Sequence, residues 1–432
     1  MSEEIVNVAF VGHVDHGKSS ILGRLLVDTE ALVDGKLERL KAYCATHAKD
    51  FEYAYLIDSL EKEQSQGITI DAARYFSRAE GRKFLFIDTP GHLDFIKNMM
   101  TGSSTADIAL LTIDAKEGIK ENTLRHVFIL SFLRIHQIFI LINKMDQIGY
   151  SEAIFTKLSG EILKVFQSHQ LLAAHILPMS AKNGDNFIKI SPNTPWYRGQ
   201  PLWQSLCSFS FPKKEKESDF RMPLQDIYRF SKKGDARRIY CGTIISGSLK
   251  KGDRILFHPS QKEGVVASME SEQAEPTAGF AIGFTLENQI FVERGELLSK
   301  KETTLPIVSN RLKARLFWIS SSPILEKAKY TFRIHTSKVG CVIEKILAVY
   351  DSVTLEAKKG DEAKAYDIVE CTICTVKPVA FDLSSRFFET NRFVLVDACE
   401  MLCSGVILES RIPSQRARLK VFMKQIFNVL FP

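Results

Sequence analysis

The chain has 432 residues, of which 45% are hydrophobic and 25% are charged, and it carries a net charge of +6. This balance is typical of a soluble globular protein with two or three domains, and the mildly basic charge permits an anionic partner without requiring one. The acidic start "MSEE" lacks the basic region of a signal peptide, and no apolar run is long enough to span a bilayer. We therefore expect a cytoplasmic protein whose eight cysteines are reduced thiols.

A glycine-containing loop interrupts the first apolar run. "IVNVAFV" predicts a buried strand and "SSILGRLL" predicts the start of a helix, and between them the chain reads "GHVDHGKSS". The pattern G-x-x-x-x-G-K-[ST] predicts a loop whose backbone N–H groups hold phosphates at a helix N-terminus. Lys18 would reach the β- and γ-phosphates, and the Ser19 hydroxyl would bind Mg²⁺. We expect the whole loop to contact the nucleotide: Gly12, His13, Val14, Asp15, His16, Gly17, Lys18, Ser19 and Ser20.

The stretch "KFLFIDTPGH" begins with a second buried strand, which ends at Asp88. A carboxylate at this position can hold Mg²⁺, directly or through water, and Gly91 can present its N–H to a γ-phosphate. His92 follows Gly91, so it is the candidate for positioning the attacking water. In "EQSQGITID", the Thr69 hydroxyl can bind Mg²⁺ while its backbone contacts the γ-phosphate, and hydrolysis would release this switch. The expected catalytic residues are His92, Thr69 and Lys18, and the expected metal ligands are Ser19, Thr69 and Asp88.

Two more strands end in motifs that suit a guanine base. "FILINKMD" ends in Asn143, Lys144 and Asp146, and "HILPMSAKNGDN" places Ser180, Ala181 and Lys182 where they can cover the base edge. An aspartate accepts hydrogen bonds from the N1–H and N2–H of guanine, whereas adenine offers no such pair, so the site would select GTP over ATP. Four motifs at four strand ends predict a doubly wound α/β sheet with its ligand at the carboxyl ends of the strands.

Together, "GHVDHGKSS", "GITID", "DTPGHLDFIKNMMTGSSTADIALLTIDAKEG" and "NKMD" resemble the elongation factor Tu family of GTPases. The resemblance implies a P-loop GTPase domain with a mostly parallel sheet, followed by two antiparallel β-barrels. It also implies GTP or GDP and Mg²⁺ as cofactors. Val14 and Ile68 match the apolar gate that flanks the catalytic histidine in this family.

Within this family, the chain resembles the GTPase subunits of bacterial heterodimeric sulfate adenylyltransferase. The resemblance rests on "GRLLVDTEAL", "PNTPWYRGQPL", "KARLFWISSSPI" and "VKPVAFDL". It implies that GTP hydrolysis drives ATP sulfurylase, which forms adenylyl sulfate from ATP and sulfate in a small partner subunit. The chain departs from the subfamily pattern at His16, Gln64 and Ser65 and at the "LCSGVI" stretch near its end, which bears on partner coupling.

The rest of the chain divides by composition. We expect a GTP-binding domain at 1–212, β-barrels at 213–303 and 304–412, and a basic amphipathic tail at 413–432. The charged "SFPKKEKESDFRMP" and "ETTLPIVSNRL" are the predicted linkers, and "VECTICTV" is predicted to be a strand rather than a metal site. The tail either docks a partner or an anionic surface, or packs as a helix on the last barrel.

Two other functions remain open. The chain could be an elongation-factor-like carrier of aminoacyl-tRNA, or a signalling or assembly GTPase of the same build with another partner. Binding of tRNA requires a basic, aromatic-lined path across the barrels, and the sequence does not display one.

Overall fold

The computed structural model describes residues 5–32, 35–46, 51–57, 69, 71–79, 82–210, 219–229, 237–271, 273–358, 363–383, 385–398 and 400–410. The chain forms two compact units, Met1–Ser210 and Phe211–Pro432. Gln64, Ser65, Ile68 and the tail 413–432 lie outside the described residues, and the expected domain boundaries stay predictions.

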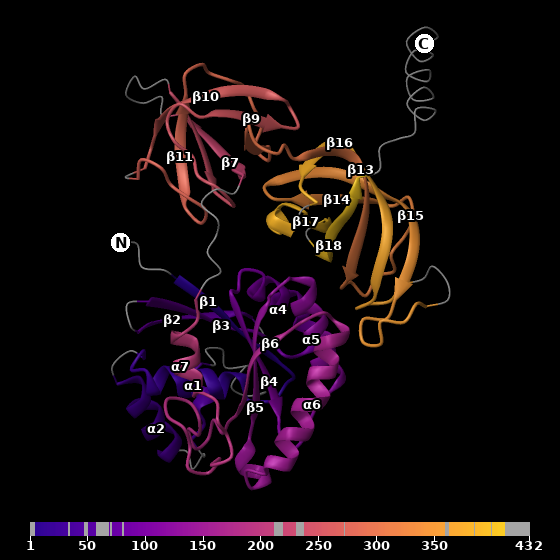
Figure 1. Cartoon of the computed structure of the whole chain (residues 1–432). Helices are drawn as coiled ribbons and strands as arrows, with labels where there is room; N and C mark the ends of the chain where they lie inside the picture. The colour runs from indigo at the N-terminus through magenta and orange to yellow at the C-terminus, as the bar shows by residue number, and fades with distance from the viewer. Residues whose placement is uncertain are drawn as a thin grey trace. The chain divides into compact units, whose positions relative to one another are not determined.

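The first unit is built on one six-stranded sheet (Figure 1). Its order is β2-β3-β1-β4-β5-β6, and only the edge strand β2 is antiparallel to its neighbour. Parallel strands covered on both faces read as continuous apolar runs, and every residue of β4 is buried. The strands are β1 (Ile5–Gly12), β2 (Ala73–Ala79), β3 (Arg82–Asp88), β4 (Ile108–Asp114), β5 (Gln137–Asn143) and β6 (Ala173–Pro178).

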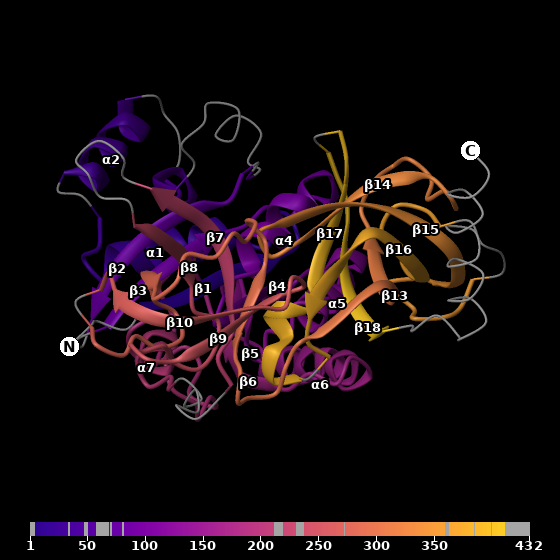
Figure 2. The ribbon, with the colours of Figure 1, turned by 90° about the horizontal axis from the view of Figure 1, so that it is seen from above.

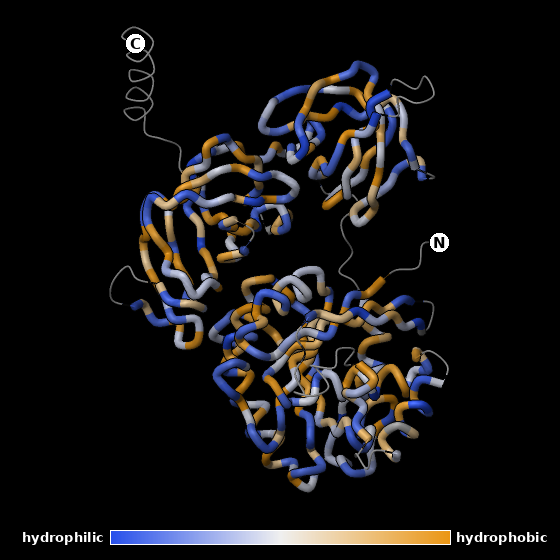
Figure 3. Tube along the Cα trace, turned by 180° about the vertical axis from the view of Figure 1, so that it is seen from behind, coloured by the Kyte–Doolittle hydropathy of each residue, from blue (hydrophilic) through white to orange (hydrophobic). Residues whose placement is uncertain are grey.

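Helices lie on both faces of this sheet (Figure 1). Phe84 contacts Trp203 of α7 on one face, and Ile87 lies against Gly102 of α4 on the other. In Figure 3 the hydrophobic segments follow the strands inside this unit, whereas many loops are hydrophilic. The α-helices are α1 (Lys18–Asp28), α2 (Lys36–Thr46), α4 (Ile96–Ser103), α5 (Glu121–Phe132), α6 (Glu152–Ser168) and α7 (Leu202–Cys207), and the 3₁₀ turns are η1 (Tyr53–Leu56), η2 (Leu93–Phe95) and η3 (Met145–Ile148).

The first barrel of the second unit closes in the order β10-β11-β8-β7-β12-β9. Its core contains Tyr240, Phe257 and Phe284, whose rings contact one another. Closing the sheet on itself leaves no open edge, which stabilises a small all-β domain. The strands are β7 (Met222–Arg229), β8 (Arg238–Thr243), β9 (Arg254–His258), β10 (Lys262–Met269), β11 (Ala281–Leu286) and β12 (Leu297–Lys300).

The second barrel closes in the order β13-β16-β15-β14-β17-β18. Register shifts between β15 and β16 mark bulges, which let long strands bend around a barrel, and Figure 2 shows β15 curving in this way. The strands are β13 (Ile307–Trp318), β14 (Lys329–Ile334), β15 (Ser337–Tyr350), β16 (Ile368–Phe381), β17 (Arg392–Asp397) and β18 (Glu400–Ser410), with the 3₁₀ segment η5 (Ser385–Thr390) between β16 and β17.

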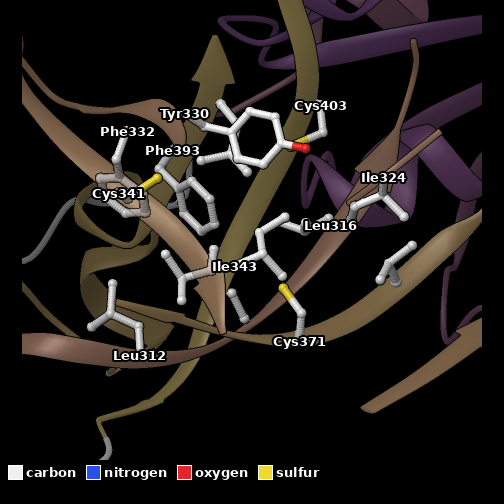
Figure 4. Packing of buried hydrophobic residues seen from close by; sticks show 14 of the residues in the cluster. Leu312, Leu316, Ile324, Tyr330, Phe332, Cys341, Ile343, Cys371, Phe393 and Cys403 are labelled. Atoms are coloured by element: carbon white, nitrogen blue, oxygen red, sulfur yellow. The ribbon is translucent and has the colours of Figure 1, made fainter. Parts of the chain in front are cut away.

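The prediction that "VECTICTV" is a strand is confirmed, because it lies within β16. Cys371 points into the barrel core with Cys341 and Cys403 (Figure 4). Burial raises the pKa of the Cys341 thiol to about 12 and that of Cys371 further, so these thiols act as small apolar side chains.

The second linker is shorter than predicted, because "IVSNRL" already belongs to β13. Among the described residues, no helix has both the length and the apolar character needed to cross a membrane.

Candidate functional site

The loop from Gly12 to Ser20 joins β1 to α1 and needs glycine at two positions. Gly12 has φ 151° and Gly17 has φ 91°, which L side chains rarely adopt. A Cβ atom on Gly12 would lie 2.5 Å from the carbonyl oxygen of Thr112, and one on Gly17 would lie 2.4 Å from Nδ2 of Asn143. The loop backbone therefore packs directly against β4 and the end of β5, and α1 begins at Lys18.

Lys18 points back into this loop. Its Nζ donates to the carbonyl oxygens of Gly12 at 3.0 Å and of His13 at 2.9 Å. Burial lowers the pKa of Lys18 to about 8, although Asp88 and Asp15 act in the opposite direction. Gly91 lies close by, since a Cβ atom there would be 2.5 Å from Lys18 Nζ. The site thus places a buried ammonium group at the N-terminus of α1, where an anion is favoured.

The three side chains that the sequence predicts as metal ligands through their oxygen atoms, those of Ser19, Thr69 and Asp88, lie together. Ser19 Oγ donates to Asp88 Oδ2 at 2.8 Å and lies 3.3 Å from Thr69 Oγ1. Asp88 is fully buried at the end of β3. Hydroxyl and carboxylate oxygens are the donors that Mg²⁺ prefers, so this donor set fits that ion.

His92 follows Gly91 and lies at the start of η2. Its ring is 47% exposed, and its Nδ1 lies 3.3 Å from both the backbone N–H and Oδ2 of Asp94. Nδ1 accepts from the backbone only when it is unprotonated, and it pairs with the carboxylate only when it is protonated. Either arrangement fixes the ring through Nδ1 and leaves Nε2 as the nitrogen that can hydrogen-bond to a water.

Asn143 connects the first loop to the loop after β6. Its Nδ2 donates to the carbonyl oxygen of His16 at 3.0 Å, and its Oδ1 accepts from the N–H of Ala181 at 3.1 Å. Beside it, Asp146 in η3 accepts a hydrogen bond from Ser180 Oγ at 2.6 Å. The two motifs predicted to recognise the base are thereby joined into one surface.

Lys144 and Lys182 complete these two motifs. Lys144 has φ 62°, and its Nζ pairs with Asp114 Oδ2 at 2.8 Å. The side chain of Lys182 is exposed at the rim of the site, as is that of Asp15, whereas Val14 and Ser20 are half-buried in the first loop.

Asp114 is a site residue that the sequence analysis missed. It ends β4 opposite Asn143 in β5. Burial by itself raises the pKa of Asp114, but hydrogen bonds from Lys144 and from the backbone of Lys116 and Glu117 lower it, and the net shift is downward. The available signal was its place at the end of the buried run "IALLTID", in the same position as Asp88 at the end of β3.

Two histidines of the first loop, His13 and His16, lie near His126 of α5. His13 Nδ1 lies 3.1 Å from Asn122 Nδ2, and His16 Nδ1 donates to the carbonyl oxygen of Thr112 at 3.3 Å. The ring centroids of His13 and His16 are 5.1 Å apart. Burial lowers the pKa of His16 to about 4 and that of His126 to about 3, so both are neutral supports of the loop at neutral pH.

Comparisons with known proteins bear on the family of the chain. Residues 3–211 match the family described as elongation factor Tu GTP binding domain, and residues 311–408 match that described as GTP-eEF1A C-terminal domain-like. Sulfate adenylyltransferase subunit 1 of Sulfurovum sp. (strain NBC37-1) is 35% identical over 414 residues, which are 92% of this chain and 85% of that protein. The protein of the same name from Teredinibacter turnerae is 35% identical over 93% of this chain and 86% of its own length. Among solved structures, that of sup35 complexed with GDP covers 95% of both chains, at 21% sequence identity and a TM-score of 0.43.

Proposed function

The chain belongs to the elongation factor Tu type of GTPases and, among them, to the sulfate adenylyltransferase subunit 1 proteins, and from this membership we propose that it hydrolyses GTP to drive adenylyl sulfate formation in a partner subunit. The observation that carries the proposal is the extent of the likeness. It spans 92–93% of the chain, so it includes both barrels and not the nucleotide motifs alone.

The residues at the carboxyl ends of the strands have separate roles in this proposal. The loop from Gly12 to Ser20 binds the phosphates through its N–H groups, with Lys18 on the β- and γ-phosphates. Gly91 presents its N–H to the γ-phosphate. Asp146 recognises guanine, while Asn143, Lys144 and the loop of Ser180, Ala181 and Lys182 shape the base pocket.

Hydrolysis in this site requires a held water and a stabilised phosphoryl group. His92 orients the water for attack on the γ-phosphorus, the bond to the bridging oxygen of the β-phosphate breaks, and GDP and phosphate result. Ser19, Thr69 and Asp88 would hold Mg²⁺, which when bound neutralises charge on the phosphate oxygens. The position of Thr69 therefore depends on whether the γ-phosphate is present.

The partner in this proposal is an ATP-using adenylyltransferase subunit that carries the sulfate chemistry. The sequence has a single phosphate-loop pattern, which the GTP site uses. We place the pair in the cytoplasm, since free thiols suit a reducing compartment, and the structure has them at Cys44, Cys241, Cys341, Cys371, Cys374 and Cys403.

The test mixes the chain with the candidate small subunit, and separately with aminoacyl-tRNA, each with a non-hydrolysable GTP analogue or with GDP. We expect tighter binding of the small subunit in the GTP-like state and more adenylyl sulfate when GTP is hydrolysed. Thr69→Ala should retain nucleotide but lose the difference between the two states. Nucleotide-dependent capture of aminoacyl-tRNA, with no change in adenylyl sulfate formation, would place the chain among the translation factors instead.

A further inference from the structure

Arg24 on α1 makes contacts to three separate segments of the first unit. Its Nε donates to both carboxylate oxygens of Asp28 at 2.9 Å, which fixes the guanidinium group on its own helix. Its Nη1 donates to the hydroxyl of Tyr53 in η1 at 3.1 Å and, over a longer 3.4 Å, to the backbone carbonyl oxygen of Lys182. The guanidinium also lies over the Tyr53 ring, 5.0 Å from its centroid. Most of the Arg24 side chain is covered, with 20% exposed.

Two glycines make this arrangement possible. A Cβ atom on Gly23 would lie 2.1 Å from the backbone carbonyl oxygen of Tyr53, so η1 can approach α1 this closely only at a glycine. A Cβ atom on Gly184 would lie 2.3 Å from Nη2 of Arg24, and Gly184 also has φ +79°. The guanidinium therefore packs against the backbone of the 180–184 loop as well as donating to it. Three elements distant in sequence meet at one side chain.

The two segments that Arg24 joins have different places in the site. Lys182 belongs to the loop after β6 that covers the guanine base in the proposed function. Tyr53 belongs to η1, which precedes Thr69 in the chain and is held from both sides. Lys36 Nζ donates to the carbonyl oxygen of Leu56 at 2.8 Å, and the Tyr75 hydroxyl donates to that of Ile57 at 2.7 Å.

We propose that Arg24 is a positioning residue that couples the 180–184 loop to η1. The inference rests on the proposed guanine-binding role of residues 180–182. With the guanidinium held between Tyr53 and Lys182, the loop stays closed on the base. A displacement of η1 removes one partner from Arg24 and loosens the loop, so the rate of nucleotide release depends on the position of η1. Such coupling is reciprocal, because a bound base in turn favours the position of η1 seen here.

The experiment measures release of a fluorescent GDP from the full chain and single-turnover hydrolysis of bound GTP. Arg24→Gln removes the guanidinium, and Tyr53→Phe removes only the hydroxyl and keeps the ring. Lys157→Gln is the control, since it removes one positive charge from an exposed position on α6. We expect Arg24→Gln to speed GDP release about three- to tenfold, the effect of losing one typical protein hydrogen bond. Tyr53→Phe should produce a smaller increase, and Lys157→Gln none.

Two readouts separate coupling from a merely structural role. General destabilisation of the domain would slow hydrolysis as well as speed release, whereas we expect single-turnover hydrolysis to stay within about twofold of wild type in each variant. The double variant that combines Arg24→Gln with Tyr53→Phe should release GDP no faster than Arg24→Gln alone, because Tyr53 acts through Arg24. The inference is overturned if release is unchanged in Arg24→Gln, or if the two effects simply multiply. If Arg24→Gln does not fold, Tyr53→Phe with unchanged release overturns it as well.

Failure of the proposed function gives a different result. A wild-type chain that does not retain GDP at all would contradict the guanine-binding role itself. A wild-type chain that binds GDP and hydrolyses GTP, beside an Arg24→Gln variant with the same release rate, would contradict only the coupling.

Discussion

At the scale of single residues, we expect base selection to depend on Asp146. Its Oδ1 accepts from Ser180 Oγ at 2.6 Å, which orients the carboxylate. Asp146→Asn replaces an acceptor by a group that can donate to the extra carbonyl of xanthine. We expect the affinity for GTP to fall by about 2–4 kcal/mol, as for an unpaired buried polar group, and that for xanthosine triphosphate to rise. Competition titrations measure both, and equal binding of GTP and ATP by the wild-type chain would contradict this role.

His92 should matter for hydrolysis and not for binding. It follows the glycine that lies against Lys18, and its ring is held at Nδ1 by Asp94. We expect His92→Ala to slow single-turnover hydrolysis by about 10²–10⁴-fold, the usual range for a group that orients or deprotonates water. The dissociation constant for GTP should change little. His136→Ala, at an exposed histidine before β5, is the control. Hydrolysis at the wild-type rate in His92→Ala would mean that another residue orients the water.

At the scale of elements, two glycines in the first unit should respond oppositely to substitution. Gly17→Ala puts a side chain at φ 91° and at 2.4 Å from Asn143 Nδ2, so it strains the start of α1 and displaces the bond from Asn143 to His16. Gly160 lies within α6, and a Cβ atom there meets nothing within 4 Å. We expect Gly17→Ala to lower both nucleotide affinity and the free energy of unfolding. Gly160→Ala should raise the latter by about 0.5–1 kcal/mol.

Calorimetry and nucleotide titration of the two variants check this pair of expectations. The signs are the decisive result, because both changes add the same methyl group. If Gly17→Ala bound nucleotide as well as wild type, the close approach of the first loop to β5 would not be required for function.

The elements that carry the motifs could be predicted because their physical signals are local. β-branched apolar runs gave β1, β3, β5 and β6, and the carboxyl ends of parallel strands share one edge of the sheet. The bends of β15 and the early start of β13 were not visible. They depend on how strands close into a barrel, which no short stretch of sequence encodes.

The candidate site was predictable in its residue types and not in its connections. Lys18, Ser19, Asp88 and Asp146 stand in recognisable spacings. The role of Asn143 in joining His16 to Ala181 could not be foreseen, since these two partners come from two other loops. The same holds for Arg24, whose partners Tyr53 and Lys182 are remote in sequence from each other.

At the scale of the whole molecule, a buried ion pair joins the two barrels of the second unit. Nε and Nη2 of Arg221, before β7, donate to the two carboxylate oxygens of Asp382, after β16, each at 2.9 Å. Nη2 of Arg221 also donates to the carbonyl oxygen of Thr304 at 2.6 Å, and Thr390 Oγ1 donates to Asp382 at 2.9 Å. Both charged side chains are almost completely buried. Removal of one partner leaves an uncompensated buried charge.

We therefore expect Asp382→Ala to lower the free energy of unfolding of the second unit by about 3–5 kcal/mol. The double variant Arg221→Met with Asp382→Leu should lose less than Asp382→Ala alone, because neither charge then remains buried. Glu293→Gln is the matched control, since Glu293 pairs with Lys377 across the same two barrels while both side chains are mostly exposed. Denaturant unfolding measures all three, and an equal loss in the control and in Asp382→Ala would contradict the argument.

Buried histidines in both units should make the protein sensitive to acid. Burial lowers the pKa of His16 in the first unit, and of His258 and His335 in the second, to about 4 each, and that of His126 to about 3. The unfolded chain takes up protons on these side chains below pH 6.5, whereas the folded chain does so only near pH 4. Stability is therefore lost as the pH falls from about 6.5 towards 4, by about 1.4 kcal/mol per pH unit for each histidine that stays neutral.

His335 offers the sharpest test of this sensitivity. Its Nε2 has no hydrogen-bond partner among the described residues, and it has φ 50°, which asparagine tolerates. In a Trp196→Phe and Trp203→Phe background, Trp318 is the remaining tryptophan and reports unfolding of the second unit. We expect His335→Asn to reduce the slope of its unfolding free energy between pH 6 and pH 5 by about 1.4 kcal/mol per pH unit. Burial is the largest influence on the pKa of His335 and lowers it, whereas a backbone hydrogen bond with Ala380 and the nearby Asp382 raise it, and the net shift is downward. An unchanged slope would mean that His335 is protonated in the folded protein, and that burial does not keep it neutral.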